Sequence, residues 1–466
     1  MAAIVADALV RADVPRVFAA PAAGGLIAAA IRARGLGVVS TASATPACIM
    51  AAVTAELGAA PGVALVSLGD GVTPVVDGAA HATRDRAAVV VVSDSARDSQ
   101  LLEPVVKASV VVEAASAAHW VAHAVQAAMV HPRGAVHLAI PPSVAAAPAL
   151  PVATTVRPAP APVPPADALD ALSDAIARAS RPVLIAGLEI AADDAKWIRA
   201  LVESLPAPVL TTPKGKGALP DPHPLAFGLL AADHPLLAQS DLLIALGVDP
   251  VELPPRVWPS GVTRIAVSPA AQDDAVVGDI TLVLEELAPR LRGRTQADWD
   301  VAALDRLKRM LGASAERPGL SRRRVVEIAR QATPVRTIVA LDVPLASAWQ
   351  SVTPRDCLIP NGVATHGFAL PAAIAAVLAG ENTRVVAIGS ATGFDAMAAE
   401  WRTAKELGVP ILAVALNDAG ATDVSRAALA AGVDVVSARD EPSFGAVFER
   451  AWRARTPTLI DAHVNR

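Results

Sequence analysis

The sequence of 466 residues contains no tyrosine, two cysteines and only 18% charged residues. Cys48 and Cys357 lie far apart in the chain, and we interpret both as buried thiols, so we predict no disulfide framework. No cluster of Cys and His has the spacing of a zinc site. A net charge of -5 gives no electrostatic reason to expect nucleic acid as a partner.

Long apolar runs are also missing, because charges, Pro or Gly interrupt each stretch before it reaches about 18 residues. We therefore expect no membrane span and no membrane partner. The first residues, MAAIVADALVRADVPRVF, include acidic residues and apolar residues at helical spacing, so they do not resemble a secretory signal. With 53% hydrophobic residues, the chain is expected to form a large core and to be cytoplasmic.

Short apolar runs rich in β-branched residues alternate with segments that carry apolar residues at helical spacing. This alternation predicts an α/β fold with doubly wound parallel sheets. It occurs in three parts of the chain, and we predict α/β domains at residues 1–146, 167–295 and 321–466. Residues 147–166 are rich in Pro and Ala and predict an extended linker, whereas the charged residues 296–320 predict a helical connector. The similar size of the first and third domains suits a duplicated architecture.

One stretch of the third domain, residues 385–420, has the pattern strand, turn, helix, strand, turn. VVAI and ILAVAL predict buried parallel strands, and the segment between them predicts one helix that ends at GVP. Ligands of open parallel sheets bind at the carboxyl ends of the strands. The loops GSATG, at 389–393, and NDAG, at 417–420, are therefore expected to face a ligand.

Several strings resemble the thiamine-diphosphate-dependent enzymes of the acetohydroxyacid (acetolactate) synthase and benzoylformate decarboxylase type. RPVLIAG and then APVLTTPKGKGALPDPHPLAFGLL look like the middle domain of that family. LDVPLASAWQ, NGVATHGFALPAAIAAVLAG, RVVAIGSATGF and LND look like the pyrophosphate domain, and VFAAPAAGG and PGVALVSLGDGVTPVVDGAAHA look like the pyrimidine domain. The resemblance covers nearly the whole chain. It implies a dimer with each active site shared between two subunits.

The resemblance also implies three devices that act on or hold the cofactor, and this sequence lacks all three, the third being the apolar residue at position 366. A glutamate that protonates the aminopyrimidine is replaced by Ala44. The Gly-Asp-Gly loop that holds Mg²⁺ aligns with Ser390, Ala391 and Thr392, so alanine stands in place of the metal-binding Asp. Together with Gly420 on the second loop, these are the positions that would contact the cofactor.

Two polar residues remain in the cleft that the resemblance implies. Asp418 aligns with a metal-binding Asn, and His366 aligns with an apolar residue that supports the cofactor. We predict both as candidate acid/base groups, with Asp395 and Thr392 near enough to orient the histidine. The alternatives are a histidine that hydrogen-bonds within a packed interior and an Asp that is solvated or caps a helix.

Two other strings are not expected to bind a ligand. Gly69-Asp70-Gly71 resembles a diphosphate motif, but it lies in the first domain and predicts a tight turn. The Lys-Gly-Lys-Gly string at 214–217 resembles a turn of flavin-using relatives. Because RPVLIAGLEI lacks the additional glycines of those relatives, we do not expect FAD.

We therefore predict an acetolactate synthase-like protein with a degenerate site and no cofactor, acting as a lyase or transferase on a small acid, aldehyde or keto substrate. Whether it is an enzyme at all stays open. One alternative is a non-catalytic partner or regulator of an active paralogue. Another is a residual thiamine-diphosphate-dependent carboligase or decarboxylase that lacks the glutamate and holds Mg²⁺ through Asp418 and backbone carbonyls. A homodimer or higher homo-oligomer is expected in each case.

Overall fold

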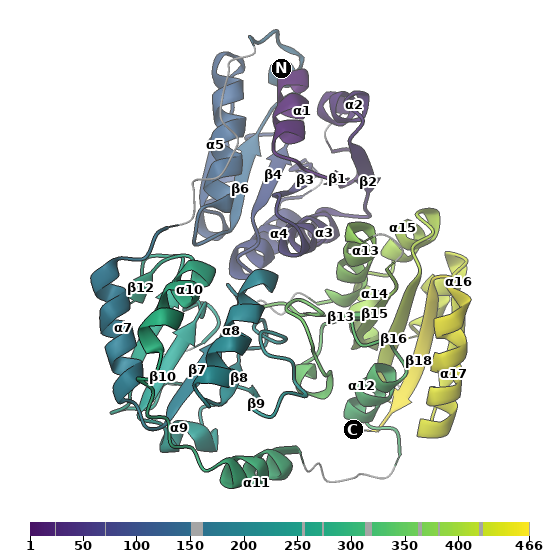
Figure 1. Ribbon diagram of the computed structural model, residues 1–466. Helices are drawn as coiled ribbons and strands as arrows, with labels where there is room; N and C mark the ends of the chain where they lie inside the picture. The colour runs from purple at the N-terminus through teal and green to yellow at the C-terminus, as the bar shows by residue number, and fades with distance from the viewer. Residues whose placement is uncertain are drawn as a thin grey trace. The chain divides into compact units, whose positions relative to one another are not determined.

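The computed structural model describes the chain apart from residues 24, 70, 151–161, 254–256, 273–274, 313–318, 362–365, 381–382, 419–422 and 466. It contains three six-stranded sheets flanked by helices, and the described strand pairings are parallel (Figure 1). The predicted fold class of three parallel α/β domains is confirmed. Within the described residues, no helix combines the length and the apolar character that crossing a membrane requires.

Two compact units are formed by the chain. The first unit holds the first and third sheets and comprises Met1–Ala159, Thr337–Val343 and Leu358–Arg466. The second unit holds the middle sheet and comprises Pro160–Arg336 and Pro344–Cys357. Most of the predicted linker at 147–166 falls on residues 151–161, outside the described residues.

The first sheet has the strand order β2-β1-β3-β4-β6-β5. Its strands are β1 (Arg16–Ala19), β2 (Gly37–Ser40), β3 (Gly62–Val66), β4 (Val89–Ser93), β5 (Ala108–Val111) and β6 (Ala135–Ala139). Its helices are α1 (Ala2–Arg11), α2 (Gly25–Ala33), α3 (Ala44–Leu57), α4 (Thr73–Arg84), α5 (Ala117–Met129) and α6 (Pro142–Ala146). Every residue of β3, β4 and β6 is buried, as parallel strands with both faces covered require.

The third sheet repeats that order as β14-β13-β15-β16-β18-β17, which agrees with a duplicated architecture. Its strands are β13 (Ile338–Leu341), β14 (Cys357–Leu358), β15 (Val385–Ser390), β16 (Ile411–Asp418), β17 (Asp434–Ala438) and β18 (Thr458–Val464). Its helices are α13 (Ala369–Ala379), α14 (Ala391–Ala396), α15 (Glu400–Glu406), α16 (Ser425–Ala430) and α17 (Glu441–Ala454).

The single helix predicted between β15 and β16 is two helices, α14 and α15. Helix α14 begins directly after the strand, because the Ser390 hydroxyl accepts a hydrogen bond from the Gly393 N–H at 3.0 Å and caps the first turn. The periodicity of apolar residues continues across both helices, so it did not reveal the interruption between them.

The middle sheet has the order β12-β11-β10-β7-β8-β9. Its strands are β7 (Pro182–Ala186), β8 (Val209–Thr211), β9 (Ala226–Leu229), β10 (Leu242–Leu246), β11 (Thr263–Ser268) and β12 (Ala275–Val277). Helices of the second unit are α7 (Ala166–Arg178), α8 (Ala192–Ser204), α9 (Pro235–Gln239), α10 (Ile280–Leu291), α11 (Val301–Gly312) and α12 (Arg322–Gln331). Strands β9 and β12 were not predicted, because each is too short to show a clear apolar run.

Helices α3 and α13 form the centre of the first unit. They pack against each other, and one hydrophobic cluster includes both helices together with strands of the first and third sheets. Both helices are apolar on nearly all sides, as expected for helices buried between sheets. Both cysteines are buried and free, as predicted, and burial raises the pKa of Cys48 and of Cys357 to about 12.

Candidate functional site

The carboxyl ends of β13, β15 and β16 bring three polar residues to one edge of the third sheet. These strands are neighbours, with Leu341 opposite Ile388 and Ser390 opposite Leu416. Ser390 ends β15, Asp418 ends β16, and Asp342 directly follows β13. Two of the predicted site residues, Ser390 and Asp418, therefore lie at the edge where parallel sheets bind ligands.

Residues 389–393, predicted as a loop, are the end of β15 and the first turn of α14. This strand-to-helix turn, called the loop after β15 below, presents hydroxyl groups where the resemblance predicts a carboxylate. The hydroxyl oxygens of Ser390 and Thr392 lie 3.3 Å apart, and the Thr392 side chain is exposed. Ala391 is 2% exposed, so its methyl group packs inward and offers no ligand. The predicted positions Ser390 and Thr392 can thus donate or accept hydrogen bonds at this edge, whereas Ala391 cannot.

Asp342 lies under this loop and was missed in the sequence. Its Oδ1 accepts a hydrogen bond from the Ser390 N–H at 3.1 Å, and its Oδ2 is buried. A Cβ on Gly389 would lie 2.4 Å from Oδ1, and a Cβ on Gly393 would lie 2.6 Å from Oδ2, so both positions require glycine. Burial raises the pKa of Asp342 to about 6, although the Ser390 N–H and the charge of His366 favour the carboxylate. The sequence signal that could have identified Asp342 is its position directly after a buried strand.

His366 lies in an exposed turn before α13, and not in a packed interior. The turn contacts the loop after β15 closely, because a Cβ on Gly367, at φ +84°, would lie 2.5 Å from the carbonyl oxygen of Gly393. The charged neighbour of His366 is Asp342. In the described part of the chain no hydrogen bond joins His366 to Asp395, Thr392 or Asp418.

Ala44 is the first residue of α3 and is 7% exposed. It therefore belongs to the helical layer of the first sheet, whereas the other predicted positions belong to the third. Glu56 lies near the opposite end of the same helix and cannot replace a carboxylate at position 44. Gly420 lies outside the described residues. Among the residues that are described, no group of three or more His, Cys, Asp or Glu side chains is arranged to hold a metal ion.

Comparisons with known proteins match all three parts of the chain. The family "Thiamine pyrophosphate enzyme, N-terminal TPP binding domain" matches residues 1–110, the central domain matches 169–287, and the C-terminal TPP binding domain matches 341–422. The first range contains β1 to β4, the central range contains all six strands of the middle sheet, and the third range contains β14, β15 and β16.

Curated proteins similar to this chain include two acetolactate synthases. The catabolic acetolactate synthase of Raoultella terrigena is 29% identical, with 80% of this chain and 75% of that protein covered. The acetolactate synthase of Bacillus subtilis is 28% identical, with 90% and 81% covered. A probable 2-ketoarginine decarboxylase of Pseudomonas aeruginosa is 32% identical, with 61% and 54% covered.

These findings overturn the prediction that the protein uses no cofactor. Both thiamine pyrophosphate-binding domains match, and together with the acetolactate synthases they point to thiamine diphosphate. The prediction rested on Ala44, Ala391 and His366 and on shortened segments near the cleft, and it gave these local changes more weight than the domains that surround them.

The side chains at the carboxyl edge of the third sheet are compatible with the use of thiamine diphosphate. The hydroxyls of Ser390 and Thr392 and the carboxylate of Asp418 are oxygen donors of the kind that Mg²⁺ prefers. Their chemistry fits a hydrated cation and a diphosphate, whereas the side chain of Ala44 offers no acid. The sheets, the ligand-facing edge and the three matched domains agree, and the chain belongs to the thiamine pyrophosphate enzyme family, of the acetolactate synthase type.

Proposed function

We propose that this chain is a thiamine-diphosphate-dependent carboligase or decarboxylase with a degenerate site, acting on a small 2-keto acid. The names of its relatives, acetolactate synthase and 2-ketoarginine decarboxylase, support the substrate class. The observation that carries the proposal is that side-chain oxygens able to bind a cation remain at the edge of the third sheet. The two positions aligned with the family's carboxylates, Ala391 at this edge and Ala44 at the start of α3, are buried methyl groups.

The roles of the chain's own residues follow from that edge. Asp418 would supply a carboxylate for Mg²⁺, and the hydroxyls of Ser390 and Thr392 would hydrogen-bond to the diphosphate or to the hydration shell of the cation. Asp342 holds the loop in place through the Ser390 N–H, so it is a positioning residue. Thiamine diphosphate, when bound, supplies a nucleophilic carbon and an electron sink for cleavage next to a carbonyl group.

Proton transfer is where this site departs from the family. The methyl group of Ala44 can neither hold nor deliver a proton, so we infer that turnover is slow compared with relatives that keep the glutamate. His366 is exposed beside the loop and is the candidate to exchange protons with substrate or water.

The test is a calorimetric titration of the purified protein with thiamine diphosphate, with and without Mg²⁺, followed by an assay of pyruvate consumption and carbon dioxide release. We expect thiamine diphosphate to bind only when Mg²⁺ is present, and we expect the turnover of pyruvate to be slow. Asp418→Ala is expected to weaken binding about tenfold or more, whereas Asp395→Ala, an exposed change on α14, leaves it unchanged. Absence of binding to the wild-type protein would contradict the proposal, and unchanged turnover in His366→Ala would remove the histidine from it.

A second candidate function is a non-catalytic partner or regulator of an active paralogue. It is favoured by the loss of both carboxylates, at Ala44 and at Ala391, because two alanines impair both ends of the cofactor site. Cofactor binding with no turnover of any 2-keto acid, together with a changed rate of a co-purified paralogue, would select this candidate.

A further inference from the structure

Helix α5 packs on α1, β4 and β6 and carries two histidines on its exposed face (Figure 1). His119 and His123 are four residues apart, about one helical turn, so both side chains project from the same side of the helix. Both residues are exposed, whereas Val121 and Ala122 between them are buried. The proposed thiamine chemistry uses neither histidine.

The two imidazole rings already face each other. Their centroids lie 6.1 Å apart, and the angle between their planes is 10°. The indole ring of Trp120 contacts both imidazoles edge-on, at centroid distances of 5.2 Å from His119 and 5.8 Å from His123. Because these contacts restrict the rotation of both imidazoles, less conformational entropy is lost when one ligand joins the two rings.

Two imidazoles one helical turn apart can bind one metal ion between them. The same spacing of two histidines on a helix supplies two of the zinc ligands in metalloproteases. A zinc–nitrogen bond is about 2.0–2.1 Å long, so a small rotation of each ring brings one nitrogen of His119 and one of His123 to a common ion. Imidazole nitrogen suits Zn²⁺, Ni²⁺ and Cu²⁺, whereas Mg²⁺ prefers oxygen ligands. This face of α5 therefore favours a late first-row transition-metal ion.

The pair forms an open site and not a closed one. Among the described residues, no third His, Cys, Asp or Glu side chain joins the two histidines in an arrangement that could hold a metal ion. Water would fill the other positions of the ion, as it does where a site supplies few protein ligands. The sequence was expected to hold no zinc site, and an open pair of histidines departs from that expectation.

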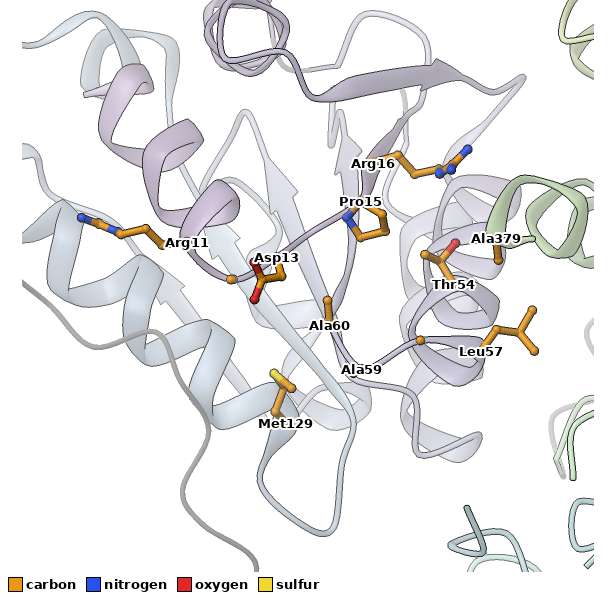
Figure 2. Close-up of a pocket in the computed structure, with 12 residues that line it drawn as sticks. Arg11, Asp13, Pro15, Arg16, Thr54, Leu57, Ala59, Ala60, Met129 and Ala379 are labelled. Atoms are coloured by element: carbon orange, nitrogen blue, oxygen red, sulfur yellow. The ribbon is translucent and has the colours of Figure 1, made fainter. Parts of the chain in front are cut away.

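The other end of α5 does not offer a comparable site. Met129, the last residue of α5, lines a cavity of about 380 Å³ together with Arg16 and Asp13 (Figure 2). The Asp13 carboxylate and the carboxyl ends of α1, α3 and α5 disfavour an anion there, whereas the charge of Arg16 disfavours a cation. A charged ligand is therefore expected at the exposed histidines and not in the cavity.

We propose that His119 and His123 bind one late first-row transition-metal ion through one nitrogen of each imidazole, beside the indole of Trp120. The affinity is highest for Cu²⁺, as the general order of these metals requires. The site lies on the first sheet's part of the chain, and the proposal does not depend on the proposed function.

Calorimetric titration of the full chain with Ni²⁺, Zn²⁺ and Mg²⁺ tests the proposal, slightly above neutral pH where imidazole is largely neutral. Ni²⁺ and Zn²⁺ are each expected to bind at least tenfold more tightly than Mg²⁺. His119→Asn and His123→Asn are each expected to weaken Ni²⁺ binding at least tenfold. His463→Asn, the same change on β18, is the matched control and is expected to leave this affinity unchanged.

Trp120 gives a second measurement that does not depend on heat. Bound Cu²⁺ is paramagnetic and quenches the fluorescence of an adjacent indole, so Cu²⁺ is expected to quench part of the tryptophan fluorescence in a saturable way. Trp120→Phe should lose this saturable quenching and keep Ni²⁺ binding, whereas His119→Asn should lose both. Because both histidines are exposed, unchanged thermal unfolding temperatures are expected for their variants.

Three results would overturn the proposal. The first is the absence of Ni²⁺ and Zn²⁺ binding to the wild-type protein. The second is an equal loss of Ni²⁺ affinity in His119→Asn and His463→Asn, because the metal would then bind elsewhere. The third is saturable quenching by Cu²⁺ that persists in Trp120→Phe, because the bound ion would then lie beside another tryptophan.

Discussion

The Glu400 carboxylate accepts a hydrogen bond from the backbone N–H of Ala42 at 2.6 Å. Glu400 begins α15 of the third sheet, and Ala42 lies two residues before Ala44 in the loop that enters α3. Glu400 is 1% exposed, and burial raises its pKa. The entry to α3 is therefore held by a side chain from the third sheet's part of the chain, 358 residues away in the sequence.

Replacing Glu400 by Ala should destabilise the first unit. The change leaves the Ala42 N–H without its acceptor and opens a cavity, which together are expected to lower the free energy of unfolding by about 2–4 kcal/mol. Glu406→Ala, on the exposed end of the same helix, is the control and should change it by less than about 0.5 kcal/mol. Urea unfolding measures both variants, and equal effects would refute the structural role of the Ala42 contact.

Restoring a carboxylate in the loop after β15 should strengthen metal-dependent cofactor binding. Ala391→Asp adds an oxygen ligand next to Ser390, so the Mg²⁺ concentration at half-saturation of thiamine diphosphate binding is expected to fall about tenfold or more. Ala396→Asp, at the exposed end of α14, is the matched control with the same change in charge. If both variants lower the Mg²⁺ concentration at half-saturation equally, the added negative charge, and not a restored metal ligand, explains the change.

Restoring the acid at the start of α3 should raise turnover. With saturating thiamine diphosphate and Mg²⁺, Ala44→Glu is expected to raise kcat by about 10²–10⁴, the usual contribution of a placed acid or base. Because position 44 is buried, the free energy of unfolding should fall, and this is measured separately by urea unfolding. An unchanged kcat in a folded, cofactor-saturated variant would show that proton transfer does not limit this enzyme.

Stability of the second unit should depend on pH through Glu252. Its carboxyl group accepts hydrogen bonds from the Thr212 hydroxyl at 2.5 Å and from the Leu188 and Asp249 N–H groups at 3.0 and 3.2 Å. Burial nevertheless raises the pKa of Glu252 from 4.5 to about 7. Between these pH values the folded state keeps a proton that the unfolded state releases. The free energy of unfolding should therefore fall as pH rises, by up to about 1.4 kcal/mol per pH unit.

A neutral side chain at position 252 removes this dependence. Urea unfolding between pH 4.5 and 7 is expected to show a smaller slope with pH for Glu252→Gln than for the wild-type protein. Glu285→Gln, an exposed change on α10, should keep the wild-type slope. Equal slopes in the wild-type protein and in Glu252→Gln would show that another group titrates in this range.

The sheets and the family could be predicted because their signals are local. Runs such as ILAVAL show a buried strand through their own composition, and β15 and β16 formed where such runs predicted them. Short strands such as β9, and the break between α14 and α15, carry no comparable local signal. Asp342 was missed because nothing in LDVP shows that Gly389 and Gly393 pack onto its carboxylate.

The sequence by itself determined the α/β domains, the strands β15 and β16, and the alanines at positions 44 and 391, because periodicity and residue identity are properties of short segments. Only the tertiary structure decided that Asp342 supports the loop after β15 and that Glu400 holds the entry to α3. Each of these contacts joins segments far apart in the chain. The burial of the Asp342 and Glu400 side chains, which raises the pKa of both, comes from packing that no single segment encodes.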